Sequence, residues 1–167
     1  MKPTTAPPEG LTSITEAKPG DILAGREHGD GERAAPFGVL ARVDRDPWKL
    51  TIQGRPPIEA SGDWRLWVVT LPKAAQQLLE LARRHDWKTL IAPSLDHCDH
   101  LYVTIHLARS EPLIYLQATW HTHDTGTLRL TSKIWRHVPV EGRGFDWRDA
   151  PSLRKISEVI TGEAEPA

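Results

Sequence analysis

The chain has 167 residues, 39% of them hydrophobic, enough for one compact core or for two small units. Its net charge is −1 and its pI about 6.7, which disfavours a generally basic nucleic-acid binder but not a local basic face. The single cysteine, Cys98, excludes an internal disulfide. No signal peptide is visible, and no apolar run approaches the roughly 18 residues of a membrane helix, so we expect a cytoplasmic protein.

Both ends of the chain have the composition of disordered segments. Residues 1–19 hold four prolines among Thr, Ala, Glu and Lys, and such a segment cannot bury a core. The end of the chain, "EAEPA", is similar. We therefore predict a disordered arm over residues 1–19 and a disordered tail over residues 163–167.

Residues 20–70 show short strand patterns separated by turn residues. The stretches "FGVLARV" and "WKLTIQG" flank "DRDP", a pattern typical of a hairpin between Val43 and Trp48. The stretches "GDILAG" and "WRLWVVTL" add two more strands. Four short strands predict a small antiparallel β unit.

The pattern becomes helical at Pro72. Apolar side chains in "PKAAQQLLELARRHDW" recur on one helical face, with Thr70 as the candidate cap. Three apolar strands follow over residues 101–109, 112–121 and 127–138, after a weaker one in "KTLIAPS". Asp149 is the candidate cap of a last helix that ends at Gly162. Residues 71–162 are thus predicted to form an α-β4-α sandwich, with both helices on one face of an antiparallel sheet, and the fold class is α+β.

Four stretches of this region carry a resemblance to known proteins: "PKAAQQLLELARRHDW", "YVTIHLARS", "ATWHTHDTGTLRL" and "DAPSLRKISEVI". Residues 70–162 resemble small uncharacterised proteins of actinobacteria and of their phages or mobile elements. The resemblance implies no assigned activity, and its motifs are structural rather than catalytic.

Strand alternation separates the predicted sheet into an apolar face, which the helices must cover, and an open face. A two-residue turn at Ser110 and Glu111 would place His100 across from His121. A three-residue loop at "DTG" would place His121 across from Arg129, and Tyr115 across from Trp135. The candidate binding residues of the open face are aromatic or basic: Tyr102, Tyr115, His121, His123, Arg129, Lys133 and Trp135.

The stretch "HTHDTG" allows two chemical interpretations besides a hairpin. Cys98, His100, His121 and His123 would supply one thiolate and three imidazoles, which zinc accepts, although Arg129 beside His121 would repel a cation. The triplet "DTG" also occurs in aspartic proteases, but a turn with glycine explains it without chemistry. The sequence contains no CxxC, HExxH, GxSxG, GxxxxGK[ST] or GxGxxG motif.

Exposed aromatic rings between basic side chains are typical of sheets that bind single-stranded nucleic acid. Alternatively, Tyr115 and Trp135 form a cross-strand pair that only stabilises the sheet, or residues 20–70 cover them. We expect a non-enzymatic accessory or adaptor protein without a cofactor, which binds a protein or single-stranded nucleic acid through the open face. A zinc-binding protein that uses Cys98, His100, His121 and His123 is the alternative.

Overall fold

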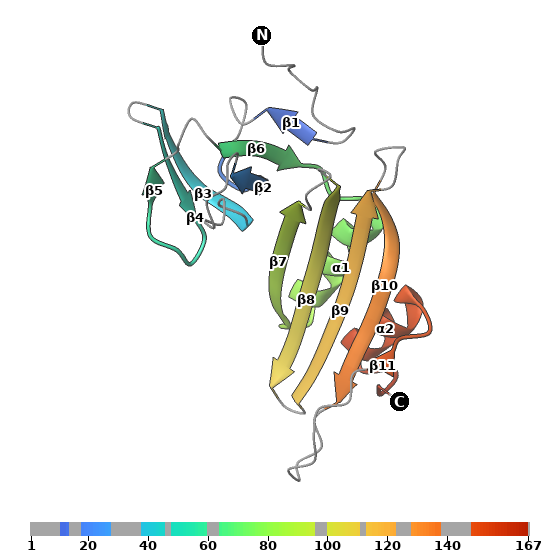
Figure 1. The fold of residues 1–167 in the computed structure, drawn as a ribbon. Helices are drawn as coiled ribbons and strands as arrows, with labels where there is room; N and C mark the ends of the chain where they lie inside the picture. Colours follow the sequence, from blue (N-terminus) through green and yellow to red (C-terminus); the bar gives the residue numbers. More distant parts are fainter. Residues whose placement is uncertain are drawn as a thin grey trace. The chain divides into compact units, whose positions relative to one another are not determined.

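The computed structural model describes residues 11–13, 18–27, 38–45, 48–59, 64–95, 100–110, 113–122, 128–137 and 148–166. These residues form two antiparallel sheets and two helices, so the predicted α+β class is confirmed (Figure 1). By their contacts they divide into two units, one of residues 1–70, 93–102 and 122–128, the other of residues 71–92, 103–121 and 129–167. None of the described helices is long and apolar enough to cross a membrane.

The first unit contains a six-stranded sheet in the order β1-β6-β2-β3-β4-β5. Its strands are β1 (Leu11–Ser13), β2 (Ile22–Glu27), β3 (Gly38–Arg45), β4 (Trp48–Ile52), β5 (Ile58–Glu59) and β6 (Trp64–Val69). The predicted hairpin is confirmed, since β3 and β4 pair antiparallel with Arg45 opposite Trp48. The buried core of this sheet contains Leu23, Leu40, Leu50 and Ile52.

Strand β1 lies inside the segment predicted to be a disordered arm. It pairs antiparallel with β6, with Leu11 opposite Val69 and Ser13 opposite Trp67. The edge of β6 supplies backbone hydrogen-bond partners that the composition of the segment cannot reveal. The prediction of disorder is therefore wrong for Leu11–Ser13.

The other sheet has five strands in the order β11-β10-β9-β8-β7. Its strands are β7 (Lys88–Leu95), β8 (Leu101–Ser110), β9 (Leu113–Thr122), β10 (Leu128–His137) and β11 (Arg148–Asp149). The helices α1 (Lys73–Arg84) and α2 (Leu153–Thr161) cover one face of it (Figure 1). The predicted alternation is confirmed in β8 and β9, because every second side chain is buried: Leu101, Val103, Ile105, Leu107, Ile114, Leu116, Ala118 and Trp120.

Helix α1 buries Ala75, Leu78, Leu79 and Ala82, as its pattern predicted. It begins after Pro72 without a side-chain cap, so Thr70 does not cap it. It ends where Asp86 takes a left-handed φ of 57° and the backbone N–H of Trp87 donates to the Ala82 carbonyl oxygen at 2.9 Å. The indole Nε1 of Trp87 then donates to the carbonyl oxygen of Ile160 at 3.1 Å, which ties the end of α1 to α2.

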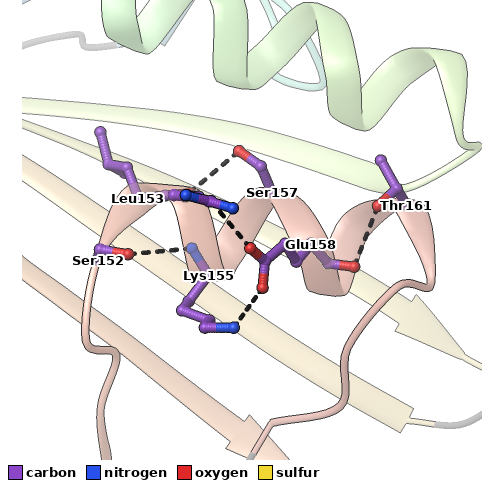
Figure 2. Close-up of polar contacts among 7 residues, drawn as sticks. Ser152, Leu153, Lys155, Ser157, Glu158 and Thr161 are labelled. Atoms are coloured by element: carbon purple, nitrogen blue, oxygen red, sulfur yellow. Dashed lines mark hydrogen bonds and ion pairs between the residues drawn. The ribbon is translucent and has the colours of Figure 1, made fainter.

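Helix α2 is capped by Ser152 and not by Asp149 (Figure 2). The Ser152 hydroxyl accepts the backbone N–H of Lys155 at 3.1 Å, whereas Asp149 lies in β11 opposite Ile134. Ser152 directly precedes the first helical residue, so its hydroxyl reaches the free N–H groups of the first turn. At the other end, Gly162 has a φ of 80° and the N–H of Glu163 donates to the Glu158 carbonyl, so the predicted tail begins with ordered backbone.

Candidate functional site

The candidate site is the open face, the side of the five-stranded sheet that α1 and α2 do not cover. Three threonines cross its centre on neighbouring strands. The Thr104 and Thr119 hydroxyl oxygens lie 3.1 Å apart, and the Thr131 hydroxyl donates to the Thr119 carbonyl oxygen at 3.2 Å. The second contact joins residues that the predicted register of β9 and β10 places opposite each other.

The pairing of β8 with β9 differs from the prediction by two residues. Strand β8 ends at Ser110 and β9 begins at Leu113. At the other end of the pair, the Leu101 N–H donates to the Thr122 hydroxyl at 2.8 Å. The predicted turn at Ser110 and Glu111, which places His100 opposite His121, also places Leu101 opposite Trp120. A shift of two residues leaves every side chain on its own face, so alternation cannot distinguish the two registers. The predicted position of His100 across from His121 is wrong for this reason.

The described residues of β7–β10 that carry a charge on the open face are all basic. Strands β7, β8, β9 and β10 contain no Asp or Glu, although the whole chain has 22 acidic residues. Lys88 and Arg129 are exposed on this face and Lys133 is half-buried. These four strands are therefore locally basic in a chain of net charge −1. The absence of acidic residues from these four strands is readable in the sequence, and our sequence analysis missed it.

The aromatic side chains of the predicted face differ in exposure. Tyr115 on β9 is 37% exposed. Trp135 on β10, which we expected beside it, is only 5% exposed, so its ring is not available to a ligand. Alternation gives the direction of a side chain but not whether another segment packs over it. Tyr102 is half-buried and belongs to the first unit, so the site is built from residues of the second.

Two histidines lie on the open face among the described residues of the second unit. His121 is half-buried, as expected for a side chain between the buried Trp120 and Thr122. Burial lowers the pKa of His106 below its ordinary value, so this histidine is neutral at pH 7. The unfolded state takes up a proton on this histidine more readily than the folded state does. The free energy of unfolding therefore decreases as the pH falls through the ordinary histidine pKa. His106 therefore adds no positive charge to the face at neutral pH.

The zinc alternative depends on residues that the structure does not describe. Cys98 and His123 lie outside the described residues, and His100 belongs to the first unit. Within the described ranges, no three His, Cys, Asp or Glu side chains come close enough to hold a metal ion.

Metal analysis tests this alternative directly. We expect protein purified without chelator to contain clearly substoichiometric zinc, and Cys98→Ser to leave the melting temperature nearly unchanged. Stoichiometric zinc, together with a large loss of stability in Cys98→Ser, would favour the zinc-binding function over the open face. Elemental analysis by mass spectrometry and a thermal melt suffice.

A groove lies between the two helices, away from the open face. This groove of about 480 Å³ has an apolar floor that includes Leu78, Leu81 and Leu153. Its rim charges are paired within their own helices: Arg84 lies 3.7 Å from Glu80 and Arg154 lies 3.1 Å from Glu158. Hydrogen bonds from Lys155 and Arg154 also hold the pKa of Glu158 below its ordinary value. Because these charges are already paired, the groove has fewer charged groups available to bind an ionic ligand than the open face has.

No family model matches this chain, and neither does any curated protein or solved structure. The resemblance to small proteins of actinobacteria and their phages therefore stays an expectation. The geometry of the open face carries the functional argument alone.

Proposed function

We propose that this chain is a cytoplasmic, non-enzymatic accessory protein that binds single-stranded nucleic acid through the open face. The observation that carries the proposal is the charge of that face. Lys88, Arg129 and Lys133 lie on strands without a single acidic residue. Such a surface attracts a polyanion, and phosphate contacts release condensed counterions, which supplies most of the affinity in non-specific binding.

The rest of the face suits a single strand better than a duplex. Tyr115 presents a partly exposed ring on which a base can stack, near the start of β9. A sheet face with aromatic and basic side chains is a recurrent platform for unpaired bases. Trp135 is not part of this site, because it is buried.

Removing a charge and removing the aromatic ring should have different effects on binding. Arg129→Ala should weaken oligonucleotide binding mainly at low salt and reduce the slope of log K against log salt by roughly 0.7 per lost phosphate contact. Tyr115→Ala should weaken binding by about 1–3 kcal/mol at every salt concentration, because stacking is not screened. Fluorescence anisotropy with a short labelled oligonucleotide at several salt concentrations measures both effects.

A matched control is Arg83→Ala, which removes an exposed positive charge from α1, on the covered side of the sheet. It should change neither affinity nor slope. Equal effects of Arg83→Ala and Arg129→Ala would mean that net charge, and not the open face, attracts the ligand. A parent protein that ignores oligonucleotides but binds an acidic polypeptide through Arg129 would instead identify a protein partner.

A further inference from the structure

Among the strands that the structure describes, β7 forms one edge of the five-stranded sheet (Figure 1). Ile91 and Pro93 are buried on the helix side of the sheet. Leu90 has the opposite parity along β7, so its side chain points to the open face. Leu90 is 62% exposed, more than any other large hydrophobic side chain of the described residues. A hydrophobic edge strand with an exposed leucine is a template for pairing with another strand.

Pro93 indicates which backbone groups of β7 face outward. Proline is tolerated in a sheet where its nitrogen, which has no N–H, points away from the neighbouring strand. Alternate residues of a strand direct their backbone groups to the same side. Thr89 and Ile91 therefore present their N–H and C=O groups at the edge, and those of Leu90 point towards β8.

We propose that β7 pairs antiparallel with β7 of a second copy of this chain, centred on Leu90. In this register Thr89 of each copy exchanges hydrogen bonds with Ile91 of the other. The two Leu90 side chains lie opposite each other as a non-hydrogen-bonded pair, with Cα atoms about 4.5 Å apart. Pro93 falls opposite Trp87, beyond the end of the strand, so its missing N–H costs no hydrogen bond.

The distribution of charge is compatible with a second copy in this arrangement, because no like charges lie directly opposite each other. Residues 89–95 carry no charge, and Lys88 of each copy lies opposite Ala92 of the other. The two Lys88 side chains are then about 14 Å apart along the strands, which is beyond the screening length of about 8 Å at physiological salt. Residues paired across strands share a face, so the two open faces join into one basic surface.

The interface is one strand pair and two leucines, smaller than the roughly 1,600 Å² of a standard stable interface. The dimer is therefore weak and its population rises with protein concentration. Sedimentation equilibrium without nucleic acid should show reversible dimerisation of the parent protein. Leu90→Lys should abolish it, because an edge lysine blocks strand pairing. The matched control, Leu113→Lys, introduces the same charge at a 37% exposed leucine of the inner strand β9 and should leave dimerisation unchanged.

Cysteine cross-linking tests the register and does not depend on the lysine variants. In a Cys98→Ser background, Leu90→Cys should form a covalent dimer with a mild copper–phenanthroline oxidant, since the expected Cα separation suits a disulfide. Ala92→Cys, on the same face of the same strand, should not, because two copies of that position lie far apart. A parent that stays monomeric at all concentrations, or equal cross-linking at both positions, would overturn the proposal. Either result leaves the nucleic-acid proposal standing, since no oligonucleotide is present.

Discussion

Trp135→Ala is expected to lower the free energy of unfolding by about 3–5 kcal/mol, as large aromatic truncations in protein cores do. The ring is only 5% exposed, and its strand position is paired with Arg148 of β11. The surroundings of a buried indole cannot collapse fully into the space that it leaves. Urea denaturation followed by circular dichroism measures the change in stability. Oligonucleotide affinity of the folded fraction should not change.

Tyr115→Ala is the control for this prediction. Tyr115 lies on the same sheet but is 37% exposed, so its loss should cost about 1 kcal/mol or less, the range of a cross-strand aromatic contact. The two variants should therefore show opposite profiles, one losing stability and the other losing affinity. If Trp135→Ala kept its stability and lost oligonucleotide binding, the indole would belong to the site and the open face would extend further along β10.

Trp87→Ala should cost a similar amount, about 3–5 kcal/mol. Trp87 is 4% exposed and combines three interactions: apolar packing, the hydrogen bond to the Ile160 carbonyl oxygen at 3.1 Å, and the Arg109 guanidinium 5.3 Å from its ring centroid. Its loss would open a cavity where the end of α1 meets α2. A thermal melt and a urea titration would both register the change.

Trp87→Phe separates the hydrogen bond from the packing. The phenyl ring keeps most of the apolar contact but leaves the Ile160 carbonyl without its donor, which should cost about 1–3 kcal/mol. Arg109→Met should change stability by under about 1 kcal/mol. It removes the cation–π contact, but also a buried Nε atom that has no hydrogen-bond partner in the described part of the chain. A loss in Trp87→Phe as large as in Trp87→Ala would show that the hydrogen bond dominates.

The open face shows which properties of a site the alternation of strand residues can predict. The alternation of residues 113–122 placed Tyr115 and His121 on the uncovered side, and the structure agrees. The same pattern placed Trp135 there as an exposed ring, although it is buried. Alternation reports a direction relative to the strand. Whether that direction ends in solvent depends on segments that are distant in the sequence.

The two helix starts show a similar limit. Both helices and their buried faces followed from the spacing of apolar residues, because a period near 3.6 has one structural solution. Their caps did not, since Thr70, Asp149 and Ser152 all have a suitable side chain. The residue that caps a helix depends on where the preceding strand ends. Because β11 extends through Asp149, the helix begins later and Ser152 caps it.

The sequence by itself determined the α+β class, the β3–β4 hairpin, the core face of the main sheet and the absence of acidic residues from strands β7–β10. These features depend on periodicity and composition, which are local. Only the tertiary structure decided the register of β8 with β9, the pairing of β1 with β6 and the burial of Trp135. Each of these depends on which distant segment supplies a hydrogen bond or a covering side chain, and a strand can slip by two residues without moving any side chain to the other face.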